Sequence, residues 1–104
     1  MPLKVAARRG ADAVLFPECA TTGYACDFGT LDSVKLRAAL RHVGELAALL
    51  RINVLIGSPV FRGHSLLNCL VVFDRAGRET YRYAKCHLTA ADRRWFTPGD
   101  AVAL

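Results

Sequence analysis

Two charged side chains follow apolar runs of the sequence, and both could take part in acid–base chemistry. Glu18 comes directly after the run 13–16 and Pro17, and Lys85 ends a later β-rich run. A buried carboxylate or ammonium group is costly unless it is paired or used. Active sites of α/β folds gather at strand ends, so a base and a cation at one site would explain both residues. The ordinary alternative is a solvent-facing acid and a solvent-facing lysine.

The segments before and after Glu18 predict an α/β arrangement of helices and strands. Gly10 is placed to end a helix over the first residues, and the apolar run 13–16 predicts a strand buried on both faces. A helix is predicted from Asp32 or Ser33 to about Leu50. Its apolar positions recur at helical spacing, at Leu36, Leu40, Val43, Ala47 and Leu50. A second buried strand is expected over 53–61, with a bend at 57–59.

The segment that leads to Lys85 predicts a β-hairpin. Two β-rich runs flank "DRAG", in which Asp74 and Gly77 suit a tight turn. Strand alternation places Tyr81, Tyr83 and Lys85 on one face of the second arm. If that tyrosine face is the packed one, Lys85 points inward.

Composition indicates one globular domain. The 104 residues are 53% hydrophobic and 22% charged. The sequence contains neither an apolar run of membrane-spanning length nor the apolar core of a signal peptide, so we expect no membrane association and a cytoplasmic location. The formal charge of +5 leaves a basic nucleic-acid module as an alternative. The arginines are scattered, however, which favours a solvated surface and no nucleic-acid partner.

The cysteines and histidines lack the short spacings of metal or redox motifs. We expect the four cysteines, Cys19, Cys26, Cys69 and Cys86, to be reduced thiols. A zinc site from His64, Cys69, Cys86 and His87 is conceivable, but the irregular spacing favours no metal.

Two long segments carry a family resemblance. "GADAVLFPECATTGY" resembles the segment around the catalytic glutamate of the nitrilase superfamily, the carbon–nitrogen hydrolases. "YRYAKCHLTAADRRWFTPGD" resembles that family's catalytic-lysine segment, and "LLNCLVVFDRAGR" fits the hairpin before it. The resemblance covers residues 1–104. It implies one partial domain of an α-β-β-α sandwich, an N-terminal-half fragment without the first strand and the nucleophile-bearing half.

The resemblance also implies a reaction. Such enzymes hydrolyse small amides or nitriles through a Glu-Lys-Cys triad without a cofactor, and the intact family member is expected to be a homo-oligomer. Glu18 would be the general base and Lys85 the cation that stabilises the oxyanion. The family's cysteine follows the lysine segment, and none of the four cysteines matches it. Cys19 adjoins Glu18, but neighbours in an extended segment project to opposite sides, so we expect them not to share a site.

Four further residues are candidates for the site beside Glu18 and Lys85. Asp92 occupies the place of an additional family glutamate that helps to position the lysine, although a surface acid paired with Arg93 or Arg94 is the alternative. Tyr24, Trp95 and Phe96 would line a substrate pocket or, being aromatic, belong to the core.

The sequence therefore predicts a carbon–nitrogen hydrolase of amidase-like or nitrilase-like type. The alternative is a non-catalytic remnant of such an enzyme that acts as a binding or assembly module. The chain alone is expected to be inactive, because the nucleophilic cysteine is missing from it.

Overall fold

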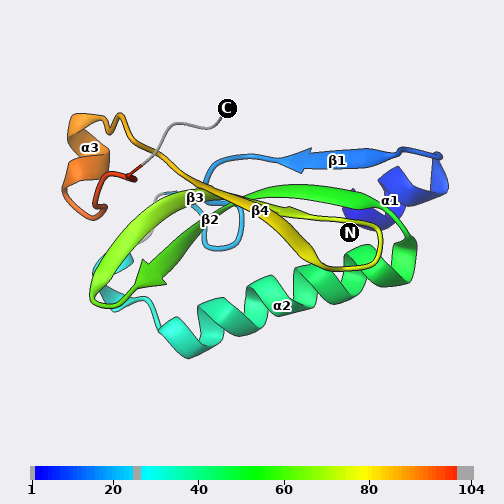
Figure 1. The fold of residues 1–104 in the computed structure, drawn as a ribbon, viewed down its shortest axis with the longest axis horizontal. Coiled ribbons are helices and arrows are strands. Elements are labelled where there is room, and N and C mark those ends of the chain that lie inside the picture. The colour runs from blue at the N-terminus through cyan, green and yellow to red at the C-terminus, as the bar shows by residue number, and fades with distance from the viewer. Residues whose placement is uncertain (1, 25–26, 101–104) are drawn as a thin grey trace.

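A mixed four-stranded sheet, one face of which is covered by two helices, makes up the computed structural model, which describes residues 2–24 and 27–100 (Figure 1). The strand order is β1-β2-β3-β4; β1 and β2 are parallel, and the other neighbours are antiparallel. The predicted α/β class is confirmed. The elements in chain order are α1 (Pro2–Arg8), β1 (Ala13–Phe16), the 3₁₀ turn η1 (Phe28–Thr30), α2 (Ser33–Leu50), β2 (Asn53–Arg62), β3 (Ser65–Phe73), β4 (Glu79–Ala84) and α3 (Ala90–Arg93).

The helix boundaries follow the predicted capping signals. Gly10 adopts a φ of 78° after α1, a left-handed conformation that glycine takes without steric cost. Asp32 is the N-cap of α2, where its side chain accepts hydrogen bonds from the backbone N–H groups of Val34 and Lys35. The predicted α2 therefore begins and ends where the sequence places it.

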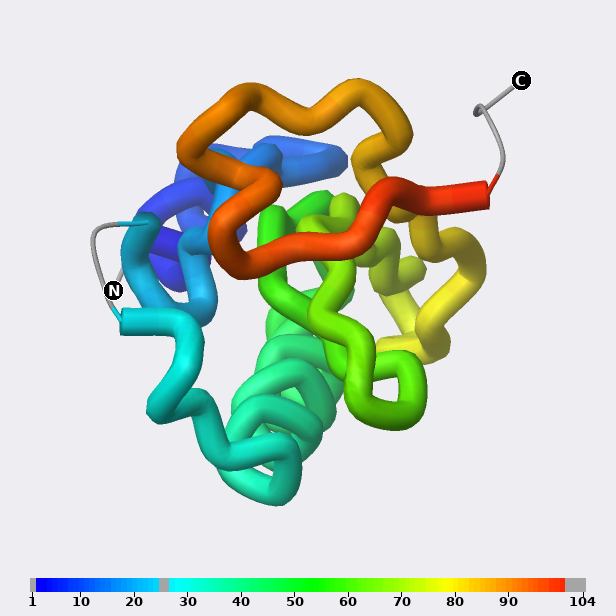
Figure 2. Tube along the Cα trace, turned by 90° about the vertical axis from the view of Figure 1, so that its left-hand side faces the viewer, coloured from blue at the N-terminus to red at the C-terminus, as the bar shows by residue number. Residues whose placement is uncertain are grey.

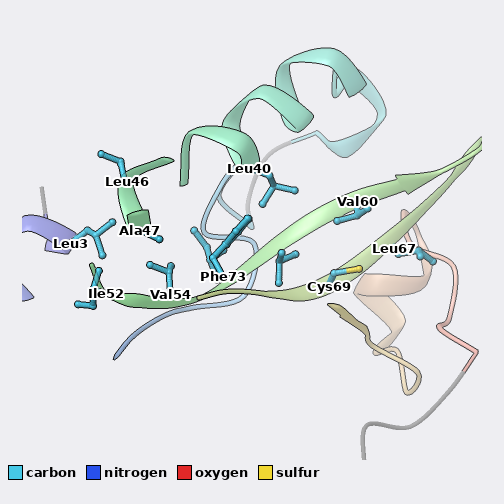
Figure 3. Packing of buried hydrophobic residues seen from close by; sticks show 12 residues of the cluster. Leu3, Leu40, Leu46, Ala47, Ile52, Val54, Val60, Leu67, Cys69 and Phe73 are labelled. Carbon is cyan, nitrogen blue, oxygen red and sulfur yellow. The ribbon is translucent and has the colours of Figure 1, made fainter. Parts of the chain in front are cut away.

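The main core lies between the sheet and the two helices α1 and α2. Figure 3 shows Leu40 and Ala47 of α2 packed over Val54 and Phe73 of the sheet. Leu3 of α1 extends the same cluster, and it is fully buried. Alternate residues of β2 and β3 thus form one apolar layer, as strand geometry requires.

The opposite sheet face corrects two expectations. Leu15 of β1 is 70% exposed, so the prediction of a strand buried on both faces is wrong. Tyr81 is 47% exposed while Ala84 packs on the core, so the tyrosine face of β4 is not the packed one. The reason is that α1 and α2 cover only one side of the sheet. We call the other side the second sheet face; its apolar residues include Leu15, Leu55, Leu70, Val72, Tyr81 and Tyr83.

Two hairpins join the last three strands. The predicted turn between β3 and β4 is present, with the Gly77 N–H donating to the Asp74 carbonyl at 2.9 Å. A second, two-residue connection at Gly63 and His64 joins β2 to β3 and was not predicted. The register of β2 with β3 runs without a break through the predicted bend at 57–59.

The C-terminal segment returns across one end of the sheet, beside the loop that follows β1 (Figure 2). The backbone N–H of Thr97 donates to Leu66 at 2.8 Å and that of Gly99 donates to Lys85 at 2.9 Å. A second apolar cluster holds the two segments together, and its buried members are Cys19, Phe28, Leu66, Leu88 and Phe96. In the described part of the chain, the helices are too short or too polar to cross a membrane.

Candidate active site

The loop after β1 lies directly on the sheet at Gly57. A Cβ atom at Gly57 would lie 2.4 Å from the Pro17 carbonyl oxygen and 2.6 Å from the Glu18 Cα atom. Only a residue without a side chain therefore lets the loop backbone pass so close to β2. Cys19 then turns the chain with a φ of 53°. This crossing carries Glu18 onto the second sheet face, toward β3 and β4.

Lys85 is held at its backbone on both sides. Its N–H donates to the Asn68 carbonyl at 2.8 Å, which continues the β3–β4 pairing just past the end of β4. Its carbonyl accepts from Gly99, and a Cβ atom on Gly99 would lie 2.3 Å from the Ala84 carbonyl oxygen. Lys85 and Asn68 lie opposite each other in the continued β3–β4 pairing. Their side chains therefore point to the same side of the sheet, the second sheet face that Glu18 reaches.

Glu18 and Lys85 form an ion pair, with 3.0 Å between Glu18 Oε1 and Lys85 Nζ. The side-chain amide of Asn68 donates to the same oxygen, Oε1, at 2.6 Å. Neither of these bonds uses Oε2 of Glu18, whose side chain is 45% exposed. The carboxylate is therefore fixed by one oxygen, and the other can take a proton.

Asp92 lies on the other side of the same ammonium group, 2.9 Å from Lys85 Nζ to Asp92 Oδ2, and its side chain is fully buried. Its position comes from a capping box at the start of α3: Thr89 and Asp92 each accept a hydrogen bond from the other's backbone N–H. This local motif brings the short aspartate side chain to the lysine. Within the described residues, no ion pair joins Asp92 to Arg93 or Arg94.

The charged forms of Lys85 and Asp92 stabilise each other. Hydrogen bonds from Lys85 to Asp92 and then to Glu18 raise the pKa of Lys85 above its ordinary value, against the effect of burial. Burial alone would raise the pKa of Asp92, but donors from Tyr24, Lys85 and Thr89 outweigh it and hold that pKa well below its usual range. Lys85 is thus a cation, and Asp92 an anion, at neutral pH.

The three aromatic residues proposed for a pocket lie in different surroundings. The Tyr24 hydroxyl donates to Asp92 Oδ1, next to the ion pairs. Phe96 is 5% exposed and belongs to the second apolar cluster. Trp95 lines a hollow with Phe61, His64 and other residues, and the Arg94 guanidinium lies 5.1 Å from its ring centre. Tyr24 is bonded to the cluster through its side chain, whereas Trp95 and Phe96 are bonded to Asp92 through their backbone N–H groups.

A sequence model of the carbon–nitrogen hydrolase family matches residues 3–104. The chain belongs to the carbon–nitrogen hydrolase family. A search of curated proteins found no match.

Solved structures with the same fold include the NitN amidase from Nesterenkonia sp. AN1, at 21% identity and a TM-score of 0.88. A mutant of the amidase from the same organism, in complex with butyramide, matches at 22% identity and a TM-score of 0.87. The first match covers 95% of this chain and 40% of the amidase; the second covers 96% and 41%. This carbon–nitrogen hydrolase chain therefore spans about two-fifths of the length of those amidases, and the likeness shows its fold.

The cysteines of this carbon–nitrogen hydrolase chain lie in different surroundings. Cys69 is buried on the helix side of the sheet, and burial raises the pKa of its thiol to about 11. The Cys86 Sγ atom donates to the Ala84 carbonyl at 3.5 Å. Cys26 lies outside the described residues. Among the residues that are described, no group of three potential metal ligands converges, so the zinc set considered from the sequence is not assembled.

Cys19 corrects one expectation. Its thiol contacts Asn68 Oδ1 at 3.8 Å, while Glu18 accepts from the nitrogen of the same amide. The two neighbours therefore do not project to opposite sides, because Cys19 has a left-handed backbone and not an extended one. The thiol is nevertheless fully buried.

Asn68 is the residue whose part in the site was missed. Its backbone carbonyl accepts from Lys85 and its side chain donates to Glu18, so one residue contacts both charged groups. A signal was available: a single polar amide interrupts the apolar run "LLNCLVVF", and a buried amide needs hydrogen-bond partners.

Proposed function

We propose that this chain supplies the general base and the oxyanion-stabilising cation of an enzyme that hydrolyses non-peptide carbon–nitrogen bonds in small amides or nitriles. The observation that carries the proposal is the ion pair of Glu18 and Lys85 at 3.0 Å, supported by Asp92 and Asn68. A Glu-Lys-Cys triad would complete the reaction, with the cysteine supplied by another segment of the family domain.

In this reaction, Glu18 Oε2 takes the proton from the cysteine thiol, and the thiolate attacks the amide carbon. The carbonyl oxygen becomes an oxyanion beside Lys85. When the tetrahedral intermediate collapses, the carbon–nitrogen bond breaks, Glu18 returns the proton to nitrogen, and ammonia leaves a thioester. Glu18 then takes a proton from water, whose oxygen attacks the thioester carbon. The carbon–sulfur bond breaks to release the acid and the thiolate, and Glu18 returns the proton to the sulfur. One amide and one water thus give one acid and one ammonia.

Lys85 suits the cationic role because of how its protons are used. An ammonium group has three donors. One is directed to Glu18 and one to Asp92, which leaves the third for the substrate oxygen. Because Asp92 and Glu18 stabilise the charged form, the ammonium is fixed before the substrate arrives, and such preorganised donors are the most effective in stabilising a developing charge.

The first substrates to test are small amides. The amidase from Nesterenkonia sp. AN1 has been solved in complex with butyramide and, as another mutant, with acrylamide. These two compounds suit a chain with the same fold.

The second candidate is a non-catalytic remnant that acts as a binding or assembly module. Its basis within the described residues is that Cys19 and Cys69 are buried and that burial raises the pKa of Cys69, so neither of these two thiols is placed to act as the nucleophile. The coding sequence on either side of this chain separates the two candidates. A cysteine motif in frame downstream supports the enzyme, and its absence supports the remnant.

The test of the enzyme uses the complete reading frame with that cysteine motif, assayed for ammonia release from butyramide and acrylamide. We expect Glu18→Gln to lower kcat by about 10²–10⁴-fold and Lys85→Met by about 10²–10³-fold. Glu45→Gln is the matched control, since Glu45 lies on α2 and its side chain is 66% exposed. Turnover that survives Glu18→Gln at the level of the control would overturn the assignment of the base.

A further inference from the structure

The buried carboxylate of Asp92 has a separate donor for each of its oxygens. Oδ2 accepts from Lys85 Nζ at 2.9 Å and from the Thr89 N–H at 3.0 Å. Oδ1 accepts from the hydroxyl of Tyr24, which comes from the loop after β1. The Tyr24 hydrogen bond therefore fixes the rotation of the carboxylate about its Cβ–Cγ bond.

The ring of Tyr24 is held by aromatic packing. It meets Phe28 edge-to-face with 6.0 Å between ring centres, and Phe28 packs on Phe96 at 4.9 Å. Phe96 in turn donates its N–H to the Asp92 carbonyl at 2.8 Å. Tyr24 and Asp92 are thus joined by a hydrogen bond between their side chains and, through the packed rings of Phe28 and Phe96, by the backbone hydrogen bond of Phe96.

A fully buried carboxylate needs donors at both oxygens, because solvent cannot replace a missing one. We propose that Tyr24 is a positioning residue for Lys85: its hydroxyl holds Asp92 so that Oδ2 faces the ammonium, and the ammonium keeps its direction toward the oxyanion. This rests on the proposed function of Lys85, and it assigns Tyr24 no contact with the reacting atoms.

The phenol keeps its proton and is a donor at neutral pH. Its hydrogen bond to Asp92, burial, and the charges of Asp92 and Glu18 raise the pKa of Tyr24, while Thr89 opposes them more weakly. Of the described groups that donate a hydrogen bond to the Asp92 carboxylate, Lys85 is the positively charged one.

Competitive acetylation of the chain with acetic anhydride tests the proposal, because only a neutral amine reacts. Lys4 and Lys35 are exposed and serve as internal references. In Tyr24→Phe we expect Lys85 to be labelled about tenfold faster relative to these references, because the carboxylate turns and the hydrogen bond from Lys85 Nζ to Asp92 Oδ2 is lost, an effect of this order for a bond between charged groups. Tyr81→Phe is the matched control, since it removes a hydroxyl from an exposed tyrosine on the second sheet face, and it should leave Lys85 labelling unchanged.

Equal labelling of Lys85 in Tyr24→Phe, in Tyr81→Phe and in the unchanged protein would overturn the proposal. If Tyr24→Phe does not fold, as judged by circular dichroism, the unchanged protein decides. A Tyr24 phenol that titrates by NMR near 10, as in a peptide, refutes the hydrogen bond, and a higher midpoint supports it. Labelling does not depend on turnover, so it can fail while the amide assay succeeds, or the reverse.

Discussion

Gly57→Ala tests whether the loop that carries Glu18 is held by close contact with β2. The added methyl would lie 2.4 Å from the Pro17 carbonyl oxygen, 2.6 Å from Glu18 Cα and 2.8 Å from the Cys19 nitrogen. Since carbon contacts are normally about 3.5 Å or longer, the loop must rise by about 1 Å. All three atoms belong to the backbone, so no side-chain rotation relieves the clash. We expect the free energy of unfolding to fall by about 3 kcal/mol, the upper part of the range for overpacked sites.

Urea denaturation measures this loss, and the side-chain amide signals of Asn68 report on Glu18 by NMR, because Asn68 Nδ2 lies 2.6 Å from Glu18 Oε1. Gly63→Ala is the control: it makes the same substitution where no atom beyond the two neighbouring residues lies within 4 Å of the added methyl, at a φ of 61°. That strain costs about 1–2 kcal/mol and should leave the Asn68 signals in place. A Gly57→Ala protein with the stability of the unchanged chain and unmoved Asn68 signals would refute the close-contact argument.

Three further predictions concern charge, thiol reactivity and the second sheet face. Because the pKa of Asp92 is lowered, its stabilising contribution is present above about pH 3.9 and is lost as pH falls below that value; urea midpoints should therefore decline less steeply with acid in Asp92→Asn, and equal slopes would contradict the ion pair. Since burial raises the pKa of Cys69 to about 11, we expect the Cys69 thiol to be alkylated no faster than the whole protein unfolds, as measured by mass spectrometry. Alkylation at the rate of a peptide thiol would show that the site opens locally. Leu15 is 70% exposed on the second sheet face and Leu49 is 74% exposed on α2, so we expect Leu15→Glu to reduce self-association in sedimentation velocity more than Leu49→Glu; equal effects would mean that this face does not drive association.

Much of the secondary structure could be predicted because local signals decide it. Asp32 caps α2, Gly10 follows α1 in the left-handed conformation, and "DRAG" forms the expected turn. Each of these depends on residues that are close in sequence. The exposure of β1 could not be predicted in the same way, because a four-residue apolar run does not tell whether one face or both are covered.

The site was predictable in its residue types and less so in its contacts. Glu18 and Lys85 follow β1 and β4, which are the two edge strands of the sheet, and Glu18 reaches Lys85 because the loop after β1 crosses β2. The reach of Asp92 had a local signal, the spacing of "TAAD" that is typical of a capping box. The loop crossing at Gly57 and the turn at Cys19 had none, because they depend on where two distant backbone segments meet.

The short helix α3 has a consequence for how the cation can be released. Four residues are too few for a helix to be stable alone, and this one is held by the capping box and by the contacts of Asp92. Because the same carboxylate caps the helix and neutralises Lys85, fraying of α3 and loss of the ammonium's partner are a single local opening. The amide of Asp92 donates to Thr89 Oγ1, so its hydrogen-exchange rate measures how often Lys85 is left with Glu18 alone.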